Sequence, residues 1–266
     1  MKVVILAGGL GTRISEETHL RPKPMITIGD MPILWHIMKG YGDQGFKEFI
    51  ICGGYKCEVI KDFFNNYLLY TSDVTFDLKN EKAKFFNANN ENWNVTVVNT
   101  GLSTQTGGRL KRVSHLLSDD EPFFFTYGDG LSNVDFKQEL EFHNAHNGIA
   151  TVLGVRPPAR YGALSVKDGL VESFKEKPVN EVNGLINGGF LILDKKVIEY
   201  INGDECSFEI DQLPALAHAK QLFSFRHDGF WQAMDTLRDL HLLRKVWDSG
   251  EKPWKLNGRP DIKRKI

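Results

Sequence analysis

Cysteine is scarce in this chain of 266 residues, which holds only Cys52, Cys57 and Cys206. They form no CxxC pair, and no paired His/Cys spacing accompanies them. A disulfide framework needs paired cysteines at regular spacings, so the pattern argues against a small disulfide-stapled scaffold. It predicts reduced thiols in a cytoplasmic protein.

An excess of one charge and a long hydrophobic run are also lacking. Lysine and arginine total 33 against 34 aspartates and glutamates, which gives no general basic field for nucleic acid or an anionic membrane. The apolar run near the N-terminus has about five residues, and no stretch approaches the ~18 of a membrane-spanning helix. We therefore expect a soluble protein with no nucleic-acid and no membrane partner, in which any anion site is local.

The length suits one large α/β domain, because a chain of this size buries most of the surface that its unfolded form exposes. We expect a single domain over residues 1–250, with an inserted hairpin over 73–94, and a basic C-terminal tail over 251–266. We interpret the tail as solvated chain rather than a binding patch. The hairpin is open to three interpretations: an oligomer contact, a lid or an ordinary surface insertion.

Short apolar strands alternate with segments that have the spacing of helices. Val3–Leu6 and Phe49–Cys52 each end in glycines, and Ile33–Tyr41 has apolar residues at helical spacing. This alternation predicts a mostly parallel sheet with helices on both faces and ligand sites at the C-terminal ends of its strands. Further strands are expected at 93–99, 123–127, 150–155, 163–166, 170–176 and 189–193, and further helices at 136–147 and 210–218.

The segment Leu6–Arg13, Leu-Ala-Gly-Gly-Leu-Gly-Thr-Arg, directly follows the first strand. Its three glycines let the backbone turn sharply and let an anion approach the main-chain N–H groups. A helical turn after it would add the partial positive charge of its first amides. The loop therefore predicts a phosphate cradle, with Arg13 and Lys23 as the cations that complete it beside a metal ion.

Other interpretations of this loop differ in how well they fit. It is not a P-loop, because no Gly-Lys-Ser/Thr follows. It is a poor dinucleotide fingerprint, because Ile14 stands where a third small residue should pack a helix on the sheet. A tight strand-to-helix turn without a ligand stays open from the glycines alone.

A second pair of glycines, Gly107 and Gly108, precedes an expected helix that begins near Arg109, and Thr106 stands just before them. At such a position both the backbone and the side chains can contact the edge of a ligand. The alternative interpretation is that these residues only begin a helix and bind nothing. Three later turn-forming motifs are Tyr161-Gly162, Glu176-Lys177-Pro178 and Asn187-Gly188-Gly189. A lone Glu-Lys pair is usually solvated surface worth under ~1 kcal/mol, so these motifs matter through their place in the series.

Two aspartates stand at the ends of predicted secondary-structure elements. Asp129 lies between two glycines at the end of the apolar run Phe123–Tyr127, and Asp235 precedes an expected helix. A buried carboxylate needs a cation, and the glycines leave room for metal-bound water and phosphate, so Asp129 is a good metal position. The alternatives are a turn cap for Asp129 and a helix N-cap for Asp235.

Taken in order, these motifs resemble the sugar-phosphate nucleotidylyltransferases over residues 1–255, and within that family the enzymes that act on CTP and glucose 1-phosphate. The resemblance implies a Rossmann-like mixed, mostly parallel sheet flanked by helices, the nucleotide-diphospho-sugar transferase fold. It implies attack of a sugar-phosphate oxygen on the α-phosphorus of CTP, which gives CDP-glucose and pyrophosphate. It also implies Mg²⁺ as cofactor, CTP and glucose 1-phosphate as partners, and a homo-oligomer such as a hexamer.

The resemblance also assigns roles to single residues. Arg13 and Lys23 are the catalytic cations, and Asp129 and Asp235 bind Mg²⁺. Lys177 neutralises the sugar phosphate, while Glu176 and Asn187 face the sugar. The full substrate-binding set that it implies is Leu6, Ala7, Gly8, Gly9, Gly11, Thr12, Arg13, Lys23, Thr106, Gly107, Arg109, Gly128, Tyr161, Gly162, Glu176, Lys177, Asn187 and Gly188.

Elementary chemistry agrees with this assignment. Both reactants are anions, so catalysis is mostly positioning and charge neutralisation, and no side-chain nucleophile or general base is needed. We hypothesise that Arg109 helps to select CTP, because cytosine presents acceptors at O2 and N3 whereas uracil and thymine present an opposing N3–H. Departures from the family pattern are Arg21 in place of a lysine, Ala233 in place of a proline, and the basic tail.

Two other classes of function remain open. A uridylyl- or thymidylyltransferase on the same fold would share the phosphate and metal residues. A non-catalytic relative that binds a nucleotide sugar often loses an acid or the loop arginine, and this chain keeps both. A Rossmann oxidoreductase is a more distant rival, since a fingerprint glycine is missing.

Overall fold

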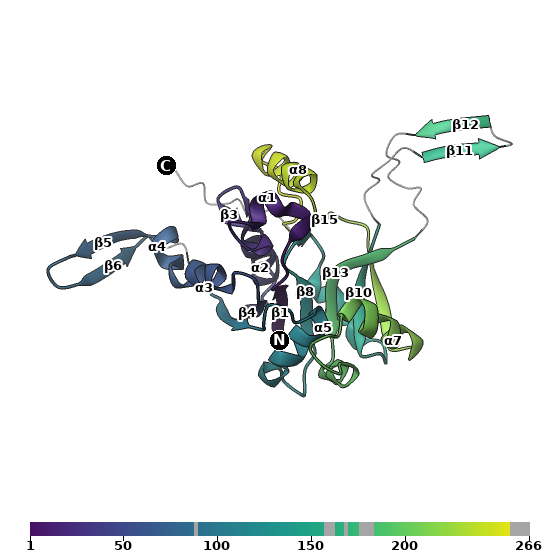
Figure 1. Ribbon diagram of the computed structural model, residues 1–266, viewed down its shortest axis with the longest axis horizontal. Helices are drawn as coiled ribbons and strands as arrows, with labels where there is room; N and C mark the ends of the chain where they lie inside the picture. The colour runs from purple at the N-terminus through teal and green to yellow at the C-terminus, as the bar shows by residue number, and fades with distance from the viewer. Residues whose placement is uncertain (88–89, 157–162, 168–169, 176–183, 256–266) are drawn as a thin grey trace.

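The computed structural model describes residues 1–87, 90–156, 163–167, 170–175 and 184–255 (Figure 1). Among these residues, no helix is both long enough and apolar enough to cross a lipid bilayer. The predicted sites Tyr161, Gly162, Glu176 and Lys177 lie outside the described residues, as does the basic tail from 256 onward.

A seven-stranded sheet forms the centre of the fold (Figure 1). One strand, β13, runs antiparallel to both of its neighbours, and every other neighbouring pair is parallel. The mixed, mostly parallel sheet that the sequence predicts is therefore confirmed. In spatial order its strands are β14 (Leu222–His227), β10 (Ala150–Val155), β13 (Ile186–Leu193), β8 (Phe123–Tyr127), β1 (Lys2–Ala7), β4 (Glu48–Gly53) and β7 (Asn94–Asn99).

Helices cover both faces of this sheet, because the alternating side chains of each strand feed two separate cores. Val3 and Ile5 of β1 pack in one core with α2, α6 and α8, while Val4 and Leu6 pack in the other with α5 and α7. The helices are α1 (Ser15–Thr18), α2 (Ile33–Asp43), α3 (Cys57–Asn65), α4 (Tyr67–Thr71), α5 (Thr106–Val113), α6 (Phe136–Asn144), α7 (Leu213–His218) and α8 (Leu237–Asp248).

The helix expected over 210–218 is divided in two. A single π-helical turn, Phe208–Gln212, comes first, and α7 then begins at Leu213. Pro214 has no N–H to donate, so it is tolerated only in the first turn of an α-helix. This irregular entry brings the Phe208–Gln212 turn against α5, with consequences for the site described below.

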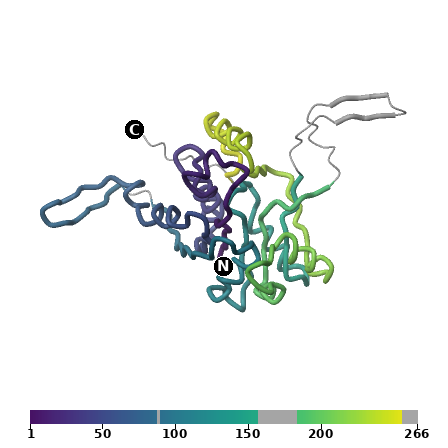
Figure 2. The backbone as a smooth tube through the Cα atoms, viewed as in Figure 1, coloured from purple at the N-terminus to yellow at the C-terminus, as the bar shows by residue number. Residues whose placement is uncertain are grey.

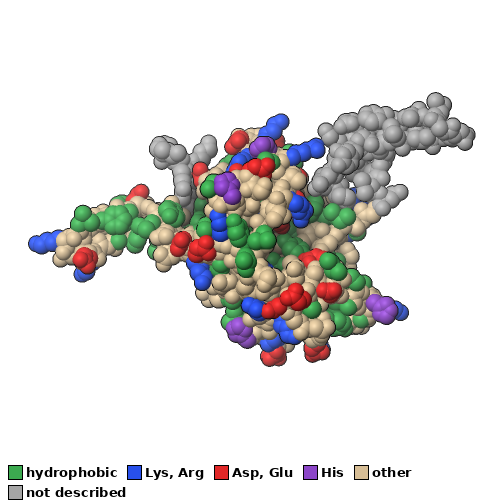
Figure 3. Space-filling view, viewed as in Figure 1, with side chains coloured by type: hydrophobic (Ala, Val, Ile, Leu, Met, Phe, Trp, Pro, Cys, Tyr) green, Lys and Arg blue, Asp and Glu red, His purple; other side chains and the backbone are tan. Residues whose placement is uncertain are grey.

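Short two-stranded ribbons complete the fold. One of them, β5 (Asp73–Asp77) with β6 (Lys82–Phe86), projects from the body of the molecule beyond α4 (Figures 1 and 2). Figure 3 shows apolar side chains along this projection. The other ribbons pair β2 (Thr27–Ile28) with β3 (Met31–Pro32), β9 (Gly130–Ser132) with β15 (Trp231–Ala233), and β11 (Ala163–Lys167) with β12 (Leu170–Lys175).

A carboxylic acid is buried inside the core. Glu139 of α6 is fully buried, and neither of its carboxyl oxygens has a hydrogen-bond partner among the described residues. Burial raises the pKa of this carboxyl from 4.5 to about 8. When folding raises the pKa of an acid, its contribution to stability is complete at any pH below its pKa in the unfolded chain. That stability is lost as the pH rises from there through the pKa of the acid in the folded protein.

We therefore expect the free energy of unfolding to fall by up to about 1.4 kcal/mol per pH unit between about pH 5 and 8 on account of Glu139. The variant Glu139→Gln cannot ionise and should lose this slope. Urea unfolding of both proteins at three pH values in this window would measure it. Equal slopes for the two proteins would contradict the expectation.

Candidate active site

The glycine loop lies at the C-terminal edge of the sheet, directly after β1. Gly11 has a φ of 65°, a left-handed conformation that favours glycine. A Cβ there would also lie 2.6 Å from Cγ2 of Thr18. By contrast, a Cβ at Gly9 would meet nothing within 4 Å, so the loop backbone is open on that side. The loop then enters a 3₁₀ turn at Thr12–Ile14.

The pairing of two short strands brings the two aspartates together. Asp129 immediately precedes β9, and Asp235 follows β15 after one residue. In this antiparallel pair Gly130 is opposite Ala233, and the N–H of Met234 donates to the carbonyl of Asp129 at 2.8 Å. Two carboxylates that are 106 positions apart in the sequence thereby reach one point at the end of β8.

Lys23 lies between these carboxylates. Its Nζ is 2.5 Å from Oδ2 of Asp129 and 2.9 Å from Oδ1 of Asp235, and its side chain is only 11% exposed. Burial alone lowers the pKa of Lys23, but the two aspartates together raise it by more than burial lowers it. The net shift is upward, so the amine is charged. Arg13 reaches the same Oδ1 of Asp235 at 3.2 Å from an exposed position. The structure thus gathers both predicted cations and both predicted acids.

The N-cap alternative for Asp235 is not what the structure shows. Thr236 is the N-cap of α8, and its hydroxyl accepts the N–H of Asp239. In return the Asp239 carboxylate accepts the N–H groups of Thr236 and Asp235. This reciprocal capping box satisfies the start of the helix. The Asp235 carboxylate can therefore point toward Lys23 and Arg13.

The two carboxylates suit a hard divalent cation whose remaining ligands are water and substrate phosphate. The described residues contain no group of three or more His, Cys, Asp or Glu side chains arranged to hold a metal. Mg²⁺ is commonly held by one or two carboxylates, with water and substrate phosphate as its other ligands. Asp129 and Asp235 match that requirement, since both are about one quarter exposed and converge on one cation.

A cleft of about 330 Å³ opens between the glycine loop and the start of α5. Eleven of the predicted substrate-binding residues lie on its wall together with Asp129. The structure therefore collects the N-terminal part of the predicted site around one cavity. Its lining consists of Leu6, Ala7, Gly8, Gly9, Gly11, Thr12, Arg13, Lys23, Pro24, Thr104, Gln105, Thr106, Arg109, Tyr127, Gly128 and Asp129.

The start of α5 is held by the protein itself. The N–H groups of Gln105 and Gly107 donate to the carbonyls of Asp204 and Cys206, at 2.8 and 2.9 Å. A Cβ at Gly107 would lie 2.9 Å from the carbonyl oxygen of Cys206, so glycine permits this approach. The close approach that Gly107 permits is thus used by another segment of the chain. Thr106 and Arg109 line the cleft, but Gly107, a predicted substrate-binding residue, does not.

Arg109 joins three strand ends. Its Nη1 donates to the carbonyls of Gly53 and Gly101 and to the Thr100 hydroxyl, and its Nη2 donates to the carbonyl of Gly8. The side chain is buried at 4% exposure, and burial lowers its pKa. These bonds fix the glycine loop against the loops after β4 and β7. The hypothesis that Arg109 selects the base stays a prediction, and the bonds above engage both of its terminal nitrogens.

We expect Arg109→Ala to lower the free energy of unfolding by about 3 kcal/mol or more, because several buried carbonyls lose their donor at once. Arg109→Lys should rescue little of this, since one ammonium cannot reproduce a planar fork of donors. Denaturant unfolding of the three proteins would measure the difference. A lysine variant as stable as the wild type would show that the fork is dispensable.

Two later predicted residues lie on β13, which passes beside β8. The Asn187 side-chain Oδ1 accepts the N–H of Gly189 at 2.8 Å. Trp231 donates its indole N–H to the carbonyl of Gly188 at 2.6 Å. Both residues are therefore fixed next to the β9–β15 pair, but neither lines the cleft described above.

The structure adds residues that sequence reasoning missed. Thr104, Gln105 and Tyr127 line the cleft, and Glu209 bonds to its wall from the Phe208–Gln212 turn. Tyr127 carried a local signal, because it directly precedes Gly128 at the end of an apolar strand. Glu209 carried none, since its contacts depend on a segment about 80 to 100 positions away.

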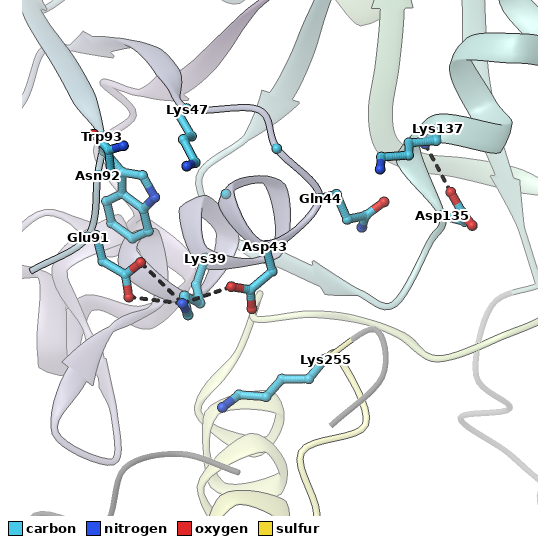
Figure 4. Close-up of a pocket in the computed structure, with 12 residues that line it drawn as sticks. Lys39, Asp43, Gln44, Lys47, Glu91, Asn92, Trp93, Asp135, Lys137 and Lys255 are labelled. Carbon is cyan, nitrogen blue, oxygen red and sulfur yellow. Dashed lines mark hydrogen bonds and ion pairs between the residues drawn. The ribbon is translucent and has the colours of Figure 1, made fainter. Parts of the chain in front are cut away.

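A larger cavity of about 660 Å³ lies near α2 (Figure 4). No predicted site residue lines it. Figure 4 shows Lys39 between Asp43 and Glu91, at 2.8 and 3.0 Å. Its lining carries charges of both signs, and Lys39 is already paired with Asp43 and Glu91, so the cavity does not match the predicted phosphate site at the glycine loop.

Comparisons with known proteins bear on the family of this chain. The family model described as "Nucleotidyl transferase" matches residues 2–245. A curated glucose-1-phosphate cytidylyltransferase of Salmonella typhimurium is 52% identical over 255 residues, which cover 96% of this chain and 99% of that protein.

Solved structures agree as well. The crystal structure of HddC from Yersinia pseudotuberculosis has a TM-score of 0.67 and 27% identity, and the match covers 92% of this chain and 99% of that one. A UDP-glucose pyrophosphorylase complexed with UDP-glucose shares the fold, with a TM-score of 0.65 at 18% identity, over 94% of this chain and 99% of that one. The chain belongs to the nucleotidyl transferase family.

Proposed function

We propose that the protein transfers the cytidylyl group of CTP to α-D-glucose 1-phosphate, giving CDP-glucose and pyrophosphate. The observation that carries this proposal is the 52% identity to the Salmonella typhimurium glucose-1-phosphate cytidylyltransferase over nearly the whole of both chains. The cleft supports it, because the glycine loop, Arg13, Lys23 and Asp129 line it, and both cations also contact Asp235.

The chain's own residues would act by binding and orientation. The open backbone of the glycine loop would hold the nucleotide phosphates, and Arg13 and Lys23 would neutralise their charge. In-line attack of one anion on another is opposed by repulsion, so fixing both reactants and offsetting their charge supplies most of the catalysis. Asn187 and Gly188 of β13 would bind at the sugar end.

We propose that Asp129 and Asp235 hold Mg²⁺. When bound, the ion supplies positive charge that stabilises the phosphate oxygens during transfer. Lys23 already places one positive charge between these two carboxylates. Nucleotide phosphates that enter the cleft would offer Lys23 a further anionic partner beside the two carboxylates.

Pyrophosphate release tests the proposal. We would supply glucose 1-phosphate and Mg²⁺ with CTP, UTP, dTTP, ATP and GTP in parallel. Turnover confined to CTP supports the proposed function. Turnover with UTP or dTTP would replace it with a uridylyl- or thymidylyltransferase on the same fold, and binding without release would favour a non-catalytic relative.

We further propose that the chain works in the cytoplasm as a homo-oligomer. All three cysteines are free thiols, which suits a reducing compartment. The projecting ribbon and α4 expose large apolar side chains, which is typical of a surface that meets another protein. Sedimentation equilibrium would give the number of copies. The exposed residues are Leu68, Leu69, Tyr70, Phe76, Leu78, Phe85 and Phe86.

A further inference from the structure

The loop that follows β4 lies against the glycine loop. The N–H of Tyr55 donates to the carbonyl of Gly8 at 3.2 Å, and the same carbonyl accepts Nη2 of Arg109. A Cβ at Gly54 would lie 2.7 Å from that carbonyl oxygen, so glycine permits this close approach. The backbone after β4 thus fixes the first part of the glycine loop.

The side chains of Tyr55 and Lys56 reach further, to the end of α1. The Tyr55 hydroxyl donates to the carbonyl of Thr18 at 3.2 Å, and Nζ of Lys56 donates to the carbonyl of His19. Nζ of Lys56 also lies 5.4 Å from the centre of the Tyr55 ring, so the two side chains pack together. The last carbonyls of a helix lack partners within it, and these two take donors from the loop after β4. We call Tyr55 and Lys56 the latch.

Thr18 connects the latch to the glycine loop. It is 4% exposed, and its hydroxyl proton is shared between the carbonyls of Gly11 and Ile14, at 3.1 and 3.3 Å. Arg13 lies between these two carbonyls in the sequence. The latch therefore restrains residues 11–19, which carry a cation of the cleft, although neither of its own members lines the cleft.

Lys56 adopts an uncommon backbone conformation. Its φ is 49°, in the left-handed region that favours glycine. A residue with a Cβ in this region costs free energy that the surrounding structure must offset. Glycine would remove this cost, and it would also remove the bond to His19. The contributions of Lys56 to the stability of the fold and to the latch can therefore be separated.

We propose that Tyr55 and Lys56 are positioning residues that hold residues 11–19 in the form that binds the nucleotide phosphates, so that CTP meets Arg13 already in place. This inference rests on the proposed function, because it assigns the phosphate end of that reaction to the glycine loop. When only a fraction of the protein has the competent loop, the apparent affinity for the ligand falls by that fraction. Once CTP is bound, its phosphates hold the loop, so the rate of the bound complex is unaffected.

The expected signature is a change in KM without a matching change in kcat. Tyr55→Phe keeps the ring and loses the hydroxyl, so the KM for CTP should rise about fivefold, as expected for the loss of one neutral hydrogen bond. The kcat and the KM for glucose 1-phosphate should change less than about twofold, because the latch contacts the phosphate end of the site.

Lys56→Gly separates function from stability. It should raise the KM for CTP about threefold through loss of the bond to His19. Its Tm should stay nearly unchanged, because the relieved backbone strain offsets the entropy that glycine adds to the unfolded chain. Lys220→Gly is the matched control: Lys220 has a φ of 57° and does not line the cleft, so this variant should keep the wild-type KM.

Two further variants test the path of the latch. Tyr67→Phe is the matched control for Tyr55→Phe, because the Tyr67 hydroxyl accepts the indole N–H of Trp35 at 2.9 Å in another part of the fold. Thr18→Val removes the hydroxyl that bonds Gly11 but keeps the carbonyl that Tyr55 binds. Combined with Tyr55→Phe, it should raise the KM for CTP no more than the more damaging single variant, since both changes break one path.

The experiment combines steady-state kinetics with calorimetric titration of CTP and of tripolyphosphate in the presence of Mg²⁺, and with melting curves for all variants. We expect Tyr55→Phe to weaken both ligands by the same factor, because the latch acts on the phosphate site. A kcat that falls as much as KM rises, unchanged tripolyphosphate binding, or additive effects in the double variant would overturn the proposal.

The same measurements distinguish this inference from the function on which it rests. If the wild-type protein releases no pyrophosphate from CTP and glucose 1-phosphate, the proposed function fails. If it does, and Tyr55→Phe and Lys56→Gly bind CTP as tightly as the wild type, only this inference fails.

Discussion

The substitution Asp235→Asn is expected to lower kcat/KM for Mg²⁺-dependent pyrophosphate release by about a thousandfold. Asp235 is the point at which the site's charges meet, because its Oδ1 contacts both Lys23 and Arg13. An amide at this position is neutral, so the metal would keep one carboxylate ligand, Asp129. The expected signature is a loss of turnover together with a higher Mg²⁺ concentration for half-activation. Asp129→Asn should cause the same loss of turnover and the same rise in the Mg²⁺ concentration for half-activation.

The matched control for this change is Asp239→Ala, four residues further along. Asp239 accepts the N–H groups that open α8, and its loss should destabilise the fold by about 0.5 to 2 kcal/mol, the range for helix caps. Activity at 25 °C should fall far less than in Asp235→Asn, since Asp239 holds only the backbone N–H of Asp235 and contacts neither Lys23 nor Arg13. If Asp235→Asn retained full activity with the same Mg²⁺ dependence, the metal assignment would be wrong.

Much of the fold could be predicted from local patterns. The apolar run at Val3–Leu6 and the aromatic run at Phe123–Phe125 are buried on both faces, and strands of this kind are recognisable in a sequence as apolar runs. The antiparallel direction of β13 had no such signal. Strand direction depends on the connection that precedes a strand, and hydrophobic periodicity does not encode it.

The site divides in a similar way. The glycine loop, Lys23 and Asp129 stand beside recognisable strand ends, so sequence reasoning found them. The structure was needed to decide whether Asp235 caps α8 or places its carboxylate in the site, because Thr236 beside it is an equally good N-cap. Arg109 was found as a residue, but its bonds to carbonyls after β1, β4 and β7 follow from how the strand ends are arranged in space.

Glu209 shows why part of the site escapes a sequence-based search. A glutamate in a polar segment is ordinarily solvated, and no spacing in the chain marks this one. It matters only because Gly107 permits the Cys206 carbonyl to approach α5, which brings the following turn to Thr106 and Tyr127. The signal lies in a contact between segments, which local composition does not record.

The second large effect is expected for Lys23→Met. Lys23 is nearly buried and bonds both aspartates, so it can neutralise phosphate and also hold the acids in place. Loss of one charge-assisted contact of this kind should reduce kcat/KM roughly 10- to 150-fold. Lys39→Met is the matched control, because Lys39 also bridges two carboxylates, Asp43 and Glu91, in the cavity away from the cleft.

Mg²⁺ provides a readout of Lys23→Met that does not depend on activity. In the wild-type protein the Lys23 ammonium occupies the space between Asp129 and Asp235, so a metal ion must compete with it for the same oxygens. Without the ammonium the two carboxylates repel each other, and binding of a divalent cation relieves that repulsion. Melting curves should therefore show a larger Mg²⁺-induced rise in Tm for Lys23→Met than for the wild type or Lys39→Met. Identical rises in all three proteins would mean that the metal binds elsewhere.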